Sequence, residues 1–279
     1  MRFNLCNGLC GFTVVLWGVA FAAQAEDAAG IDPTKRPIAE QRLEIMTARI
    51  HDIVVSSNDP LVPDHFEPKP LFRYDDETRG YVDGTLWRLG AKGRPLAIIT
   101  AELHPDYLGG GKRVVYDMLS LTDTRFTARS DSLTQWTPSQ SAFEMKPLPD
   151  APRPSDNAAR RLTQIKEQSR RFTGTQEVTE LETMNVNLRL LPREIERYAP
   201  GSNELADGAI FLLVNGRNPA LVLLVETDGT DWQYGVGRLS LPSNLELQLD
   251  GTRVWSQPRN LGSGQTLPYY ATNSTAEFP

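Results

Sequence analysis

The 279-residue chain carries 35 acidic and 29 basic side chains, which give a formal net charge of −6 at pH 7. An acidic balance spread along the sequence argues against nucleic acid and anionic membrane surfaces as partners. The only two cysteines are Cys6 and Cys10, so the remainder of the chain can form neither a disulfide framework nor a cysteine-ligated metal site.

The first 25 residues have the pattern of a secretory signal peptide. Arg2 gives a positive start, an apolar stretch spans 11–22, and residues 23–25 (Ala-Gln-Ala) fit the small-x-small cleavage rule. The apolar stretch is short for a membrane-spanning helix. We therefore expect export to the periplasm, the cell envelope or the medium, with no stable membrane span after signal cleavage. An uncleaved anchor is the alternative.

The first half of the remaining chain reads as one helix followed by strands. Apolar residues spaced four and three apart predict a helix from Pro37 to about Val55. A proline-rich loop and the Arg73-Tyr74 strand follow. Further strands are expected at 81–89, 96–103, 114–121 and 125–136, with a glycine-rich loop at 104–112.

The second half repeats this order after a stiff, proline-rich linker at 147–154. A helix is expected from Ser155 or Asp156 to about Phe172. The runs 209–214 and 221–225 are apolar at every position, so both faces of this hairpin should be covered. The other expected strands are 185–191, 233–239, 245–249 and 252–255.

Several positions of the first half recur in the second at constant spacing, which is the mark of an internal repeat. Arg73, Tyr74, Asp83, Gly84 and Glu102 return as Arg197, Tyr198, Asp207, Gly208 and Glu226. We therefore predict a signal peptide (1–25), a first repeat (26–146), a linker (147–154) and a second repeat (155–279). The expected fold class is α+β: two tandem repeats, each a helix followed by an antiparallel meander of about five strands, cystatin-like or related, packed about a pseudo-two-fold axis.

The recurring residues combine a cation, a phenol and two carboxylates, which is a possible general acid/base set. Asp83, Glu102 and His104 are therefore weak catalytic candidates. Because catalysis seldom needs two copies of each group, we interpret the recurring positions as structural. In this interpretation Asp-Gly forms a turn with glycine at positive φ, and Glu forms an ion pair with Arg.

Binding candidates lie where the two halves differ. Asp75, Asp76 and Glu77 form an acidic turn that could hold a hard cation, but they lack the spacing of a calcium loop. Lys112 ends the glycine-rich loop, which matches a phosphate-binding loop only faintly. We expect no metal and no cofactor.

Segments 81–90, 93–97, 170–172, 188–198, 207–211 and 250–255 resemble a family of uncharacterised exported proteins of planctomycete-type bacteria. The resemblance covers most of the chain after the signal. It implies export and a two-part layout, and it implies no catalytic residues.

These observations favour an exported, non-catalytic binding or interaction module, with an envelope protein or a second copy of the chain as candidate partner. One alternative is an exported hydrolase that uses a carboxylate pair, with carbohydrate as a candidate substrate. The other is a small-ligand-binding protein with a pocket between the repeats.

Overall fold

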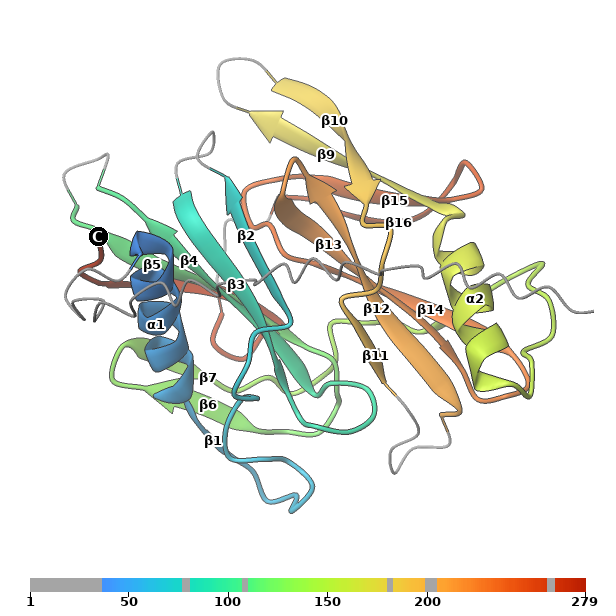
Figure 1. Ribbon diagram of the computed structural model, residues 1–279, viewed down its shortest axis with the longest axis horizontal. Coiled ribbons are helices and arrows are strands. Elements are labelled where there is room, and N and C mark those ends of the chain that lie inside the picture. The colour runs from blue at the N-terminus through green and yellow to red at the C-terminus, as the bar shows by residue number, and fades with distance from the viewer. Residues whose placement is uncertain (1–36, 77–80, 107–109, 180–182, 199–204, 260–263) are drawn as a thin grey trace, which may run out of the picture. The chain divides into compact units, whose positions relative to one another are not determined.

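Strands dominate the chain. The computed structural model describes residues 37–76, 81–106, 110–179, 183–198, 205–259 and 264–279 (Figure 1). Of these residues, 47% lie in strands and 12% in helices. The chain is therefore β-rich, as the large number of expected strands implied. In chain order the elements are α1 (Ile38–His51), β1 (Val54–Ser56), β2 (Phe72–Asp76), β3 (Tyr81–Leu89), β4 (Ala97–His104), β5 (Arg113–Ser120), β6 (Thr127–Ser130), β7 (Leu133–Trp136), β8 (Lys146–Pro147), α2 (Ala158–Ser169), β9 (Phe172–Thr179), β10 (Thr183–Leu190), β11 (Glu196–Tyr198), β12 (Asp207–Asn215), β13 (Asn218–Thr227), β14 (Trp232–Arg238), β15 (Leu245–Leu249), β16 (Thr252–Gln257) and β17 (Tyr269–Thr275).

Both helices start near the predicted positions and end early. α1 follows Pro37 directly, but β1 pairs with β6 in the segment that the helix was expected to include. α2 is capped by Asn157, whose side chain accepts from the N–H groups of Ala159 and Arg160, and not by Ser155 or Asp156. Within the described residues, neither helix is long and apolar enough to cross a membrane.

In the described part of the chain, three antiparallel sheets carry the strands. One has five strands in the order β17-β5-β4-β3-β2, and a small one has the order β1-β6-β7. The third has nine strands, with the path β16-β15-β9-β10-β12-β13-β14-β8 and β11 paired to β12. α1 contacts β3 and β4, whereas α2 contacts β12 and β13.

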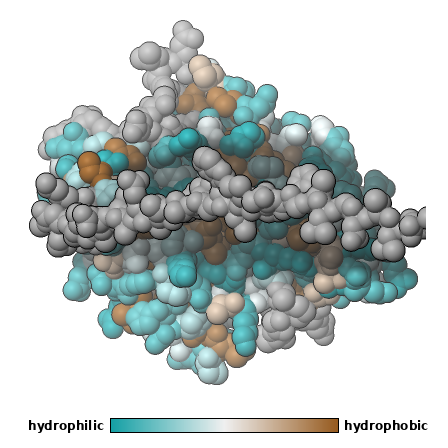
Figure 2. All heavy atoms as spheres, viewed as in Figure 1, coloured by the Kyte–Doolittle hydropathy of each residue, from teal (hydrophilic) through white to brown (hydrophobic). Residues whose placement is uncertain are grey.

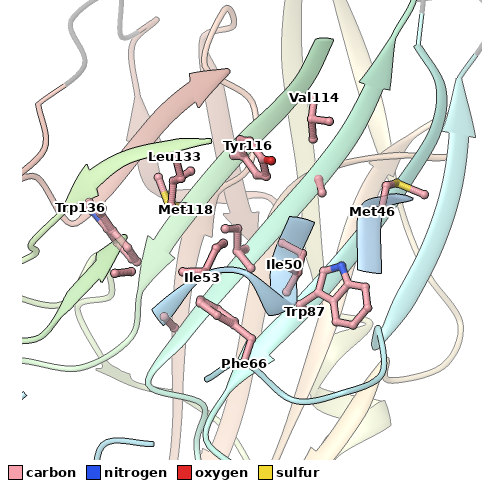
Figure 3. Packing of buried hydrophobic residues seen from close by; sticks show 14 of the residues in the cluster. Met46, Ile50, Ile53, Phe66, Trp87, Val114, Tyr116, Met118, Leu133 and Trp136 are labelled. Atoms are coloured by element: carbon pink, nitrogen blue, oxygen red, sulfur yellow. The ribbon is translucent and has the colours of Figure 1, made fainter. Parts of the chain in front are cut away.

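The core beneath α1 joins the helix to the five-stranded sheet. Figure 3 shows the helix residues Met46 and Ile50 among sheet residues that include Trp87, Tyr116 and Met118. All five are fully buried. The helix is thus held by its apolar stripe, as the 4-3 spacing predicted.

The β12–β13 hairpin has both faces covered, which confirms that expectation. Ala209, Phe211 and Leu213 of β12 belong to the core shared with α2. The alternate residues Ile210 and Leu212 belong to a separate core that also contains residues of the five-stranded sheet. An all-apolar strand here reflects two cores, one on each side.

Each large sheet also takes a strand from the other half of the chain. β17 pairs with β5 along its whole length, from Tyr269 opposite Leu119 to Thr275 opposite Arg113. β8 pairs with β14. The two halves are therefore interlocked by an exchange of edge strands.

The predicted fold class, two helix-plus-meander repeats, is wrong. The described chain is mostly β, with only two helices, and one sheet curls into a half-barrel. Four strands at one end of the nine-stranded sheet, β16-β15-β9-β10, have no place in a five-stranded meander. Edge strands also come from the opposite half of the chain, so neither sheet is completed by one repeat.

The domain boundaries remain a prediction. Residues 37–279 form one compact unit. Within the expected linker, Leu148 is buried in the α2 core, and Pro152 accepts a hydrogen bond from Trp232 Nε1 at 2.8 Å. The predicted signal peptide lies outside the described residues.

Hydrophobic side chains do not gather on the visible surface. Figure 2 shows brown residues scattered among hydrophilic ones on the face in view. Among the described residues, the exposed large hydrophobic side chains are Ile38, Val54, Leu61, Met184 and Leu267.

Candidate functional site

The recurring arginines make the same contacts at both places. Arg73 Nε donates to Asp83 Oδ1 at 2.8 Å, and a terminal nitrogen donates to the carbonyl of Ala39 at 2.6 Å. In the other half, Arg197 Nε donates to Asp207 Oδ1 at 2.9 Å and a terminal nitrogen to the carbonyl of Ala158 at 2.6 Å. Each arginine therefore ties a short strand to the first turn of a helix, which is a structural role.

The recurring tyrosines explain the recurring glycines. Tyr74 donates to Glu102 at 2.9 Å, and Tyr198 donates to Glu226. A Cβ on Gly84 would lie 2.6 Å from Tyr74 Cε2. Each glycine is inside a strand and does not have positive φ. The prediction of an Asp-Gly turn is therefore wrong. Glycine is needed at these two positions because a tyrosine ring lies against the backbone.

The two glutamates differ in their partners. Glu226 accepts from Arg94 Nε at 2.7 Å and is 1% exposed. Glu102 has His104 instead, with 3.1 Å between His104 Nε2 and Glu102 Oε2. The Arg94 guanidinium thus pairs with the carboxylate of Glu226, whereas the carboxylate of Glu102 contacts the imidazole of His104.

A second carboxylate lies near Glu102. Burial, together with the charge of Glu102, raises the pKa of Asp117 to about 7, although Tyr269 donates to its Oδ1 and opposes the shift. Asp117 is 6% exposed and Glu102 8%. This carboxylate pair belongs to the protein interior.

The catalytic candidates do not converge on one open site. In the β3–β4 ladder Asp83 pairs with Leu103, whereas Glu102 pairs with Gly84. Because neighbouring residues point to opposite faces of a sheet, Asp83 and Glu102 lie on opposite faces. Glu102 and His104 do lie together, but both Glu102 oxygens are engaged by Tyr74 and His104.

The binding candidates make structural contacts. Asp75 forms an ion pair with Arg217 at 2.8 Å. Lys112 donates to the carbonyl of Phe278 and lies 5.1 Å from the centre of its ring. Asp76 ends β2, and Glu77 lies outside the described residues. The described residues contain no group of three or more His, Cys, Asp or Glu side chains that could hold a metal ion.

A different surface has the composition of a binding site. The strands β16, β15, β9 and β10 present polar side chains on the side opposite their apolar core. We call this surface the polar face: Thr173, Thr175, Glu177, Asn185, Asn187, Glu246, Gln248 and Ser256.

The strand register arranges these side chains in rows. Ser256 is opposite Glu246, Glu246 opposite Thr175, and Thr175 opposite Asn187, so one row crosses all four strands. Neighbouring strands lie about 4.8 Å apart, so this row extends over about 14 Å. The polar face is therefore an extended array of hydrogen-bonding groups on paired strands, with one register shift between Leu247 and Gln248.

The polar face is hollowed. A cavity of about 530 Å³ is lined by six of its residues together with Asn244 and Gln257. This volume is in the range of ligand sites, about 300–1,000 Å³. In the described part of the chain, Thr175, Asn185, Gln248 and Ser256 make no side-chain hydrogen bond, so their polar groups are available to a ligand.

The two carboxylates of the polar face are already partnered. Asn244 Nδ2 donates to Glu177 Oε1 at 2.9 Å, and Arg253 donates to Glu246 Oε1 at 3.0 Å. The groups left over are mainly neutral hydroxyls and amides.

Sequence reasoning missed this surface because it missed β9. The helix was expected to run to Phe172, and no strand was assigned to 173–184. A signal was present: Thr173, Thr175 and Glu177 alternate with Gly174 and Gln176, which is the period of a strand.

Comparison with known proteins found no matching family model, no matching curated protein and no matching solved structure. The resemblance noted from the sequence therefore stays a prediction.

Proposed function

We propose that the protein is an exported, non-catalytic binding protein and that the polar face holds its ligand. The observation that carries the proposal is the cavity of about 530 Å³ on this face, lined by side chains with unused hydrogen-bonding groups. Hydrogen-bonded strands hold these side chains in place, which reduces the ordering cost of binding.

The hydrolase alternative has less support. A glycosidase needs two carboxyl groups that flank the scissile bond. Glu102 and Asp117 are 8% and 6% exposed, and Asp83 forms an ion pair with Arg73. Their surroundings suit a buried structural network better than a substrate cleft.

A pocket between the two large sheets also has less support. Their facing side chains form a packed apolar core. A hollow lined by Phe72, Asp75, Arg189 and Arg217 among others has a volume of about 250 Å³, which is below the usual range for ligand sites.

The test is co-sedimentation of residues 26–279 with isolated cell envelopes. We expect saturable binding that falls about tenfold or more in Thr175→Lys/Ser256→Lys, because two lysines would occupy and charge the cavity. Thr275→Lys is the matched control, since it adds a lysine at an exposed strand residue of the five-stranded sheet. Equal binding by all three proteins would show that the polar face is not the site.

A further inference from the structure

We infer that the ligand of the polar face is a neutral, hydroxyl-rich oligosaccharide, an inference that rests on the proposed function. The first argument is the chemistry of the available groups. Thr175 and Ser256 are hydroxyls, and Asn185 and Gln248 are amides, so each can both donate and accept. A sugar hydroxyl also donates and accepts, and can therefore pair with either kind of side chain.

The second argument is charge. Among the described residues, Glu177 and Glu246 are the charged side chains that line the cavity. Each keeps one protein partner, Asn244 and Arg253 respectively. No arginine or lysine of the described residues lines the cavity. In the cavity a phosphorylated, sulfated or uronic-acid ligand would meet two carboxylates, and the neighbouring cation, Arg253, is already paired with Glu246. A neutral ligand therefore fits better.

The third argument is polarity. In the part of the cavity lining that the structure describes, Leu245 and Pro258 are the apolar residues, and Leu245 is fully buried. A lipid chain or an apolar peptide would leave the hydroxyl and amide groups without partners, which is costly. The row of polar groups that crosses four strands suits an extended chain of sugars better than a single ring.

The fourth argument is the type of side chain. Threonine, asparagine and serine are short, and they sit on strands paired in register. Short polar side chains of this kind provide adaptable hydrogen bonds in known binding surfaces. Gln248 is the longest uncharged group on the polar face and lies beside Thr173 in the next strand.

The deciding experiment treats the envelopes before sedimentation. Periodate cleaves vicinal diols in sugars, and proteinase K removes exposed protein. We expect periodate to abolish binding of the full exported chain and proteinase K to leave it unchanged. Linear neutral oligosaccharides should compete for binding, whereas oligogalacturonate of the same length should compete about tenfold more weakly.

Point variants link the ligand to the site. Asn185→Ala and Gln248→Ala should each weaken oligosaccharide binding about three- to tenfold, the loss expected for one neutral hydrogen bond. Thr275→Lys should bind as the unmodified protein does. Thermal melting should confirm that every variant is folded.

The outcomes separate the two proposals. If proteinase K removes binding and periodate does not, the ligand is a protein, and the oligosaccharide inference is overturned while the polar face stands as a binding site. Oligogalacturonate that competes as well as neutral sugars also overturns the inference. If the Thr175→Lys/Ser256→Lys protein sediments normally with untreated envelopes, the proposed function itself fails.

Discussion

Arg94, in the turn between β3 and β4, donates to the buried carboxylate of Glu226 in β13 at 2.7 Å and so joins the two large sheets through an ion pair. A second Arg94 nitrogen donates to the other carboxylate oxygen. Tyr198 donates to the same carboxylate. Paired guanidinium–carboxylate contacts of this kind are both strong and directional.

Loss of this arginine should destabilise the protein strongly. In Arg94→Ala a carboxylate that is 1% exposed loses its cationic partner, and we expect a loss of about 3–5 kcal/mol in the free energy of unfolding. Urea denaturation at pH 7 measures it. The matched control is Arg217→Ala, because Arg217 and Asp75 are 71% and 47% exposed at their side chains and should contribute about 0–1 kcal/mol. Equal losses in the two variants would contradict the structural role of Arg94.

Asp117 should make stability depend on pH. Its pKa rises from 3.8 to about 7 in the folded protein, because of burial first and the charge of Glu102 second. Between these values the unfolded chain ionises while the folded protein holds its proton. The free energy of unfolding should therefore fall as pH rises from about 4 to 7 and then level off.

The variant Asp117→Asn removes this titration while Asn can still accept from Tyr269. We expect it to be more stable than the unmodified protein at pH 8, by on the order of 1–4 kcal/mol, and to lack the extra pH dependence between 4 and 7. Denaturation curves of both proteins across this range provide the measurement. If the free energy of unfolding depended on pH in the same way in both proteins, Asp117 would not titrate between pH 4 and 7.

Gly208→Ala should be destabilising because of Tyr198 and not because of backbone strain. A Cβ at this position would lie 2.3 Å from Tyr198 Cε2 and 3.0 Å from Glu226 Cγ. We expect a loss of about 1–3 kcal/mol, the usual result of overpacking. In a double-mutant cycle with Tyr198→Ala the two losses should be less than additive, because the clash is absent once the ring is removed.

Gly251 is a useful contrast for that cycle. It has φ of +80° and no neighbour within 4 Å of a Cβ. Gly251→Ala should lose about 1–2 kcal/mol from the left-handed backbone alone, and this loss should be independent of Tyr198. Coupling of Gly251 to Tyr198 would contradict the distinction between the two glycines.

Local pattern predicted many of the strands. Tyr81–Leu89 is a strand with the expected bounds, and Asp250-Gly251 turns the chain between β15 and β16 with both residues at positive φ. The uninterrupted apolar runs of β12 and β13 predicted that both faces of this hairpin are covered, and each face lies in its own core. These features depend on residues close together in the chain, where period and turn chemistry act directly.

The pairing of strands that are far apart in the chain could not be predicted from these local patterns. Nothing local in Tyr269–Thr275 indicates that it completes the sheet of β5, and the two-residue strand β8 is too short to have a period. A repeat suggests self-contained copies, whereas edge strands can be exchanged between halves at little energetic cost when the partner edges are alike. The fold-class prediction failed at this step.

The candidate site was missed for a related reason. The recurring titratable residues have structural partners: Glu102 accepts from Tyr74 of β2, and Asp83 accepts from Arg73, which also bonds to the first turn of α1. The polar face consists mostly of threonine, serine, asparagine and glutamine, which have no motif spacing. Its residues come together only when β9 and β10 pair with each other and with β15.

The last prediction separates the buried network from the binding site. His104→Ala and Glu102→Gln should leave envelope binding unchanged within about twofold, because neither residue lines the polar-face cavity. His104→Ala should still lower the free energy of unfolding by about 1–3 kcal/mol, since Glu102 would lose a hydrogen-bonded partner in a buried setting. Co-sedimentation measures envelope binding, and urea denaturation measures stability. Thr175→Lys should show the reverse combination, weak binding and nearly normal stability. If a folded His104→Ala protein no longer bound envelopes, the Glu102–His104 pair would belong to the functional site. An assay for reducing sugars released from envelopes by the unmodified protein would then decide whether the protein is a hydrolase.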